Sequence, residues 1–270
     1  MSPQSEFIID LEEKFPTLKA APSIEAVIHW QAHAGKKLDP ETLKAELTRR
    51  LPDYPILRTQ HDVQISAIGT PDGSSEFSQK MQWRGFRLQD EQNRHVAQFT
   101  LDGVVFSRLE PYEDWGSFQA EALRFWHIFL ELAEPTVIQR LGVRYINRIP
   151  LEADEQPSRY LSTIPAPPPG LALAAESFFH QDTYPVPGYP YTINWVRTIQ
   201  PAGADPANGR ALIVDINVFT VDIDVFTHKL LQLDQNTLAQ RLQEMRWLKN
   251  KVFFSCMTSH ALKRFGAATP

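Results

Sequence analysis

The chain has 270 residues, of which 43% are hydrophobic and 22% are charged, and its formal net charge is −5. A chain of this length buries roughly three quarters of its unfolded surface, so it needs no disulfide or metal to hold its fold. The acidic balance and the lack of a basic block argue against general nucleic-acid binding. No apolar run approaches the length of about 18 residues that a membrane-spanning helix requires.

The cysteine content and the N-terminal residues indicate where in the cell the protein is located. Cys256 is the single cysteine, which excludes a disulfide framework and a cysteine-rich zinc site and fits a reducing environment. Residues 1–14 carry four acidic side chains and no basic n-region, so they do not read as a secretory signal. We therefore expect a cytoplasmic protein.

The first 51 residues contain three predicted elements. Residues 4–15 have apolar side chains at helical spacing and predict a short amphipathic helix within an N-terminal extension, residues 1–20. Residues 24–33 alternate, imperfectly, as a strand does. Asp39 is a suitable N-cap for a helix over residues 40–51, where leucines recur every four residues.

Residues 56–109 predict short antiparallel hairpins, and a long helix follows them. The stretch 69–75 (GTPDGSS) has the composition of a turn between two strands. Residues 113–134 carry seven apolar side chains along one wide face of a helix. Because that face is broad and largely aromatic, we expect it to pack on a sheet.

The second half repeats this order of elements. It begins with a long strand at 136–151, and a stiff PAPPPG connector occupies 165–170. The last helix begins near residue 236 and continues or bends toward Phe265. The remaining predicted elements are a short helix at 156–163 and strands at 171–181, 191–200 and 211–225.

Consecutive antiparallel strands with helices packed on one face predict an α+β fold. Residues 21–135 and 136–270 each read as β-α-βββ-α, which suggests duplicated halves within one compact unit. This suggestion rests on the order of elements, because no repeat is visible at the level of residues.

One strand carries a family resemblance. Residues 140–149 read RLGVRYINRI, and softer matches occur at 18–27, 112–115 and 211–219. Together these resemble the TIGR04255 family of bacterial proteins, over roughly residues 19–265. The family usually shows Asp-x-Asp in the late strand, where this chain has Asp215 and Asn217. The resemblance implies a shared fold and a bacterial source, and it implies no particular reaction.

The arginine-rich strand supplies the candidate ligand site. On a strand, Arg144 and Arg148 lie on one face, whereas Tyr145 and Asn147 lie on the other. The planar guanidinium of arginine suits a carboxylate or phosphate ligand. The alternative, which we favour, is structural pairing of the arginines with acidic residues such as Asp215, since unpaired buried charge is costly.

No local pattern predicts a metal or a cofactor. Asp222 and Asp224 share a strand face, which is too few ligands for a cation site. His29 and His33 lie four apart in a predicted strand, where that spacing separates them by about 13 Å. Cys256 lies among apolar residues and is expected to serve packing.

A segment dense in aromatics and prolines, residues 178–191, is a candidate partner surface. Tyrosine and tryptophan give large contact areas with a polar tip, as protein interfaces require. The alternative is a hairpin loop that covers one end of the sheet. The candidate side chains are Tyr184, Tyr189, Tyr191 and Trp195.

Two functional interpretations remain. The first is a non-enzymatic bacterial binding or interaction protein with an accessory role, such as defence. The second is a carrier or enzyme for a small anionic ligand, with a polar pocket of arginine and aspartate. A deep pocket with an unpaired arginine would favour the second, and a filled interface between sheet and helix would favour the first.

Overall fold

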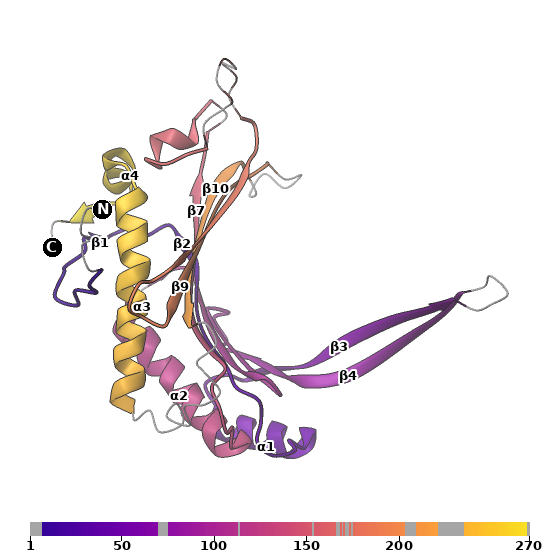
Figure 1. Cartoon of the computed structure of the whole chain (residues 1–270). Helices are drawn as coiled ribbons and strands as arrows, with labels where there is room; N and C mark the ends of the chain where they lie inside the picture. The colour runs from indigo at the N-terminus through magenta and orange to yellow at the C-terminus, as the bar shows by residue number, and fades with distance from the viewer. Residues whose placement is uncertain are drawn as a thin grey trace.

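The computed structural model describes residues 7–69, 75–112, 114–152, 154–165, 168, 170, 173, 175–202, 209–220 and 235–268. Its main element is a nine-stranded antiparallel sheet with the strand order β3-β4-β5-β6-β2-β7-β10-β9-β8 (Figure 1). The strands are β2 (Ser23–Gln31), β3 (Ile56–Gly69), β4 (Ser75–Gln89), β5 (His95–Thr100), β6 (Gly103–Leu109), β7 (Arg140–Pro150), β8 (Phe179–Pro185), β9 (Tyr191–Gln200) and β10 (Ala211–Thr220). The predicted α+β fold is confirmed.

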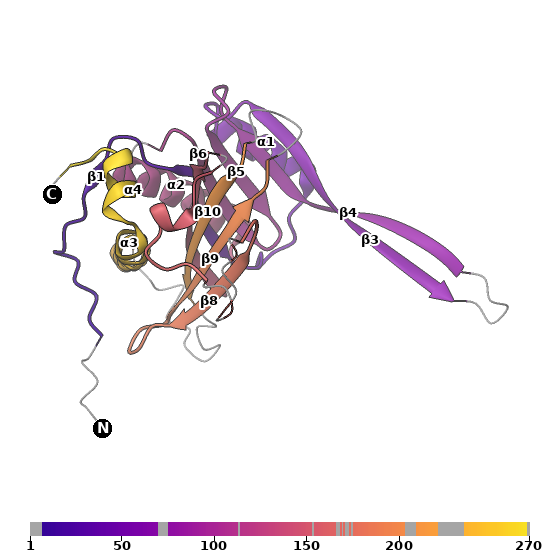
Figure 2. The same ribbon diagram turned by 90° about the horizontal axis from the view of Figure 1, so that it is seen from above.

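The long helices lie on one face of this sheet (Figures 1 and 2). Helix α2 packs on β6, and α3 packs on β7, β9 and β10. A two-stranded sheet joins the N-terminal segment to the C-terminal end of the chain. The helices and these short strands are α1 (Pro40–Arg50), α2 (Trp115–Ala133), α3 (Gln235–Cys256), α4 (Ser259–Arg264), the 3-10 turn η1 (Pro157–Arg159), β1 (Thr17–Leu18) and β11 (Ala267–Ala268).

Side-chain caps fix where the first two helices begin. The Asp39 carboxylate accepts a hydrogen bond from the Thr42 backbone N–H at 2.8 Å, as the sequence predicts. Asp114 caps α2 in the same way through the Ser117 N–H, also at 2.8 Å. Each cap satisfies a backbone donor that the first helical turn leaves without a partner. The helix therefore starts at the residue that follows the cap.

Aromatic packing holds α2 to the first half of the sheet. Trp30 of β2 stacks on Trp126 of α2, with ring centroids 5.6 Å apart. Phe125 contacts the rings of three further aromatic residues, at 5.0 to 6.0 Å from Tyr54, Phe99 and Phe106. The expectation that this helix face packs on a sheet is confirmed.

The central strands β2 and β7 join the two parts of the sheet. They pair antiparallel, with Val27 opposite Arg144 and Ile28 opposite Val143. Along the chain, the first half has the elements β2-α1-β3-β4-β5-β6-α2, and its strands lie on the β2 side of the sheet. The second half has the elements β7-η1-β8-β9-β10-α3, and its strands lie on the β7 side. That the halves arose by duplication stays a prediction.

Strands β3 and β4 form an arm that projects from the sheet (Figures 1 and 2). They are longer than the predicted hairpin strands, and their register shifts between Gln60 and His61. Val63 and Met81 are direct cross-strand neighbours on this arm, and both side chains are exposed. The arm therefore presents an apolar pair to solvent.

Several predicted elements differ from the structure. The helix predicted over 4–15 is wrong for residues 7–15, which form no helix, because apolar side chains such as Phe15 pack against α3 instead. The short helix at 156–163 is reduced to η1. The strand predicted at 171–181 begins only at Phe179. Residues 221–225 of the last predicted strand lie outside the described residues.

Within the described ranges, every helix is too short or too polar to traverse a bilayer.

Replacing Phe125 by alanine tests the role of the α2 face. The ring is fully buried, so the substitution leaves a cavity in the core. We expect the free energy of unfolding to fall by about 3–5 kcal/mol. Chemical denaturation followed by circular dichroism measures this change. Ala120→Gln on the exposed side of the same helix is the control, and a loss as large in that variant would contradict the packing argument.

Candidate functional site

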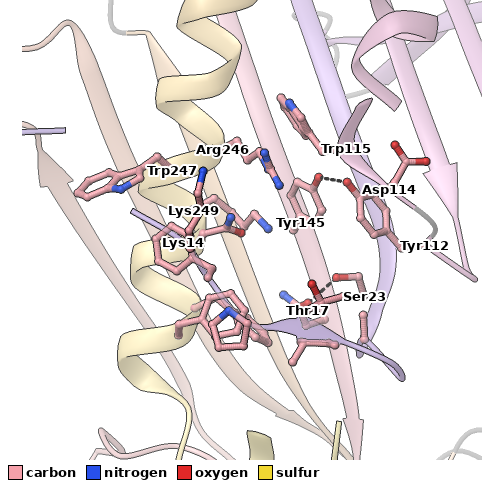
Figure 3. Close-up of a pocket in the computed structure, with 18 of the residues that line it drawn as sticks. Lys14, Thr17, Ser23, Tyr112, Asp114, Trp115, Tyr145, Arg246, Trp247 and Lys249 are labelled. Carbon is pink, nitrogen blue, oxygen red and sulfur yellow. Dashed lines mark hydrogen bonds between the residues drawn. The ribbon is translucent and has the colours of Figure 1, made fainter. Parts of the chain in front are cut away.

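A cavity of about 570 Å³ lies between α3 and the start of α2, above Ser23 of β2 and Tyr145 of β7 (Figure 3). Its walls come from β2, β7, α2, α3 and the N-terminal segment. The volume falls within the range of about 300–1,000 Å³ that is usual for small-molecule sites. The gap between two helices on one sheet face therefore makes a site of ligand size.

The sheet side of the pocket is set by the alternation of β7. Tyr145 and Asn147 are buried and face the helices, because successive strand residues point to opposite faces. The Asn147 amide oxygen accepts a hydrogen bond from the Ser23 hydroxyl at 2.7 Å, and its amide nitrogen donates to the Val214 carbonyl at 2.9 Å. Asn147 thus ties β2 and β10 to β7 at the pocket floor.

Two tyrosines form a hydroxyl pair in the same pocket. The Tyr145 hydroxyl donates to the Tyr112 hydroxyl at 2.8 Å (Figure 3). Burial raises the pKa of both phenols, so both remain protonated at neutral pH. With the Tyr145 proton used within the pair, the Tyr112 proton is available to an acceptor in the pocket.

Two cations enter the pocket from α3. Arg246 and Lys249 are three residues apart and share one helix face. The Arg246 guanidinium carbon lies 5.6 Å from the centroid of the Trp115 ring, and the Lys249 amine lies 3.8 Å from that of Tyr145. Among the described residues, no carboxylate oxygen lies within ion-pair distance of either cation.

The Lys249 amine is the most perturbed base of the pocket. Desolvation by burial, and secondarily the charge of Arg246, lower the pKa of Lys249 from its ordinary 10.5 to about 7. Both causes disfavour the ammonium form. The neutral, nucleophilic form of the Lys249 amine is therefore favoured over that of an ordinary lysine.

The N-terminal segment closes the outer side of the pocket. We call residues 7–18 the N-terminal strap. Glu13 of the strap pairs with Lys251 of α3 at 2.6 Å, and Phe15 stacks on Phe254 with centroids 5.4 Å apart. The Ile9 N–H donates to the Tyr189 hydroxyl at 3.2 Å. The ring of Phe7 also contacts Tyr189 and Trp247, and the end of the strap pairs with β11, so the strap lies across the helix.

The structure divides the residues of the predicted ligand site between two faces. Tyr145 and Asn147 line the pocket, whereas Arg144, Arg148 and Asp215 lie on the opposite face of the sheet. The Arg144 Nε lies 2.9 and 3.0 Å from the two Asp215 oxygens, which is the structural pairing favoured above. Arg148 donates to the Gly209 carbonyl at 2.8 Å. These arginines therefore do not reach the pocket.

The residues of the predicted partner surface are also separated. Tyr184 is exposed and Tyr189 is half-buried, but Tyr191 and Trp195 are buried. The Tyr191 hydroxyl donates to Glu244 of α3, and Arg197 lies over the Trp195 ring at 3.7 Å. Placing Tyr191 and Trp195 on a surface was wrong, because their strand face packs under the helix or against a buried arginine.

The remaining candidates give no metal site in the described part of the chain. There, no group of three or more His, Cys, Asp or Glu side chains is placed to hold a metal ion. Asp222 and Asp224 lie outside the described residues. Burial lowers the pKa of His29 to about 4, with Arg140 and Arg84 adding to the effect. Cys256 is buried, and its burial raises the pKa of the thiol to about 12.

Sequence reasoning missed the two cations that α3 places in the pocket. Arg246 and Lys249 lie beside the apolar stripe of the last helix, next to Met245 and Leu248. Two basic residues at i, i+3 beside such a stripe are the signal that could have found them. Strand alternation did identify Tyr145 and Asn147 as one face, but it could not show that a helix leaves space above them.

Comparison of the chain with protein-family models and with curated proteins finds no match. The geometry of the pocket must therefore carry the functional argument.

Arg144→Ala should destabilise the fold and leave ligand binding in the pocket unchanged. The Asp215 side chain is only 14% exposed, so its carboxylate would lose a bidentate partner on a partly desolvated surface. We expect a loss of about 1–2 kcal/mol in the free energy of unfolding. The double variant Arg144→Ala, Asp215→Asn should lose less than the sum of the single variants. Additive losses would show that the pair contributes nothing.

The Lys249 amine should titrate near neutrality. In a pH titration by NMR of ¹³C-labelled lysine side chains, one signal should have a midpoint near pH 7 and disappear in Lys249→Met. Because the unfolded chain binds this proton more tightly, the Lys249 contribution makes the free energy of unfolding rise with pH between about 7 and 10.5. A Lys249 signal that titrates only above pH 9 would show that the amine is solvated or paired.

Proposed function

We propose that the protein binds a small organic anion with an aromatic or other apolar body in the pocket under α3. The observation that carries this proposal is the presence of Arg246 and Lys249 in a ligand-sized cavity, without a described carboxylate partner for either. A pocket with these properties is the feature that favours the ligand interpretation over the interaction interpretation.

The pocket is also lined by Glu13, which pairs with Lys251, and by Asp114, which caps α2, so the positive charges of Arg246 and Lys249 favour an anion. Partly desolvated cations are destabilising unless an opposite charge or hydrogen bonds compensate them. Arg246 can present a planar fork of N–H donors to a carboxylate, which gives short charge-assisted hydrogen bonds. The Tyr112 hydroxyl adds a neutral donor on the opposite wall. A bound carboxylate would supply the missing negative charge.

The walls favour an apolar or aromatic body. Trp115 and Tyr145 approach the cations with their rings, and Phe253 and Trp247 of α3 also line the cavity. Aromatic rings bind flat ligands by stacked or edge-to-face contacts, typically adding about 0.5–1.5 kcal/mol per ring pair. A ligand with a carboxylate at one end and a ring at the other matches both features.

A protein-interaction role remains the second proposal. The exposed Val63–Met81 pair on the projecting β3–β4 arm supports it, since apolar side chains at the surface favour contact with partners. Tyr184 is the member of the predicted partner surface that is well exposed. The bacterial source, the cytoplasmic location and an accessory or defence role rest on the sequence and the family resemblance.

Calorimetric titration with naphthalene-2-carboxylate and its uncharged amide tests the pocket. Arg246→Gln should weaken binding of the carboxylate by about tenfold or more, since a hydrogen bond to a charged group contributes about 1.5–3 kcal/mol. The same variant should change binding of the amide little. Quenching of the fluorescence of Trp115 and Trp247 gives a second readout of binding within the cavity.

Arg49→Gln is the matched control for loss of one positive charge. Arg49 lies on the exposed side of α1, where it pairs with Glu46, away from the pocket. Its affinity for the carboxylate should equal that of the wild type. Equal weakening in both variants would show a nonspecific charge effect, and absence of carboxylate binding to the wild type would contradict the proposed function for this class.

A further inference from the structure

Lys249 differs in its surroundings from its helix neighbours Arg246, which donates a hydrogen bond to Gln243, and Lys251. Its amine lies against the face of Tyr145 at 3.8 Å, and no hydrogen-bond acceptor is recorded for it within the described residues. Lys251, two positions later on the same helix, shows the ordinary arrangement, with a side chain 47% exposed and an ion pair to Glu13 at 2.6 Å. The structure therefore leaves the Lys249 amine unpaired inside a cavity.

An unpaired amine in such a setting is suited to covalent chemistry. A lysine becomes a nucleophile when desolvation and a nearby positive charge favour its neutral form. Lys249 has both, since it is a half-buried residue that lines the pocket with its amine against the Tyr145 ring, and Arg246 lies one turn earlier on the same helix face. The lowered pKa described above agrees with this geometry.

We propose that Lys249 forms a reversible imine with the carbonyl carbon of a ligand that also bears a carboxylate, that is, an oxo acid or a carboxylated aldehyde. This inference rests on the proposed function, because Arg246 would hold the carboxylate while the carbonyl group meets the amine. It narrows the ligand class from organic anions in general to those with an electrophilic carbonyl group.

The step is balanced without an oxidant or reductant. The lone pair of the Lys249 nitrogen forms a bond to the carbonyl carbon, and the C=O π pair moves to the oxygen, which takes up a proton. The nitrogen loses a proton, the C–O bond then breaks with a second proton delivered to the oxygen, and water leaves. The nitrogen lone pair completes the C=N bond and gives the protonated imine, with a net uptake of one proton from solvent, and loss of the remaining N–H proton to solvent gives the neutral imine. The Tyr112 hydroxyl accepts from Tyr145 and so has its own O–H free to donate a hydrogen bond to the departing oxygen, while solvent supplies the protons.

Reductive trapping tests the inference. The intact protein is incubated at neutral pH with 4-carboxybenzaldehyde and sodium cyanoborohydride, and the adduct is measured by intact-protein and peptide mass spectrometry. We expect one equivalent of the probe, joined through a C–N bond at Lys249. Lys249→Met should lose this adduct, whereas Lys251→Met should keep it. Arg246→Gln should slow its formation by about tenfold.

A second probe separates the two proposals. 4-(Hydroxymethyl)benzoate keeps the carboxylate and the ring but has no carbonyl to trap, and calorimetry measures its binding. If this alcohol binds and the aldehyde labels Lys249 no faster than exposed lysines such as Lys251, the imine inference is overturned and the proposed function stands. If neither probe binds and Lys249 is not labelled, both proposals are overturned. Peptide mapping of the wild type decides the site even if Lys249→Met does not fold.

Discussion

The antiparallel pairing of β2 with β7 is the constraint on which the rest of the structure depends. It joins strands from both parts of the chain into one sheet, and α2 and α3 pack on the same face of that sheet (Figure 1). Each helix packs on its own side of this pair, and the two leave a gap above it. The pocket is thus a consequence of the topology. Asn147, hydrogen-bonded to both neighbouring strands, holds the floor of that gap.

The fold could be predicted further than the site. Caps such as Asp39 and Asp114 act locally, and strand alternation depends on neighbours alone, so both are visible in the sequence. The N-terminal segment was misjudged because its apolar spacing is set by docking on α3 and not by a helix of its own. The faces of β7 were predicted correctly, but which face meets a helix with open space depends on contacts distant in sequence.

The positively charged side chains on the two faces of the sheet have different partners. On the open face, Arg144 is neutralised by the cross-strand carboxylate of Asp215. On the helix-covered face, Arg246 and Lys249 are placed against aromatic rings, whose negative faces compensate a cation only in part. The Arg144–Asp215 ion pair therefore stabilises the fold, whereas Arg246 and Lys249 keep positive charge that could attract an anionic ligand. An arginine-rich strand drew attention in the sequence, yet its arginines serve the scaffold.

The N-terminal strap has a kinetic consequence. It crosses the pocket through the Glu13–Lys251 ion pair, the ring contacts of Phe7 and Phe15, and the Ile9–Tyr189 hydrogen bond, and only its last two residues belong to a strand. Terminal segments with little secondary structure open at a smaller free-energy cost than the whole domain. If a ligand binds under α3 as proposed, its release would require this segment to detach, and added salt, which screens the Glu13–Lys251 pair, would speed that release.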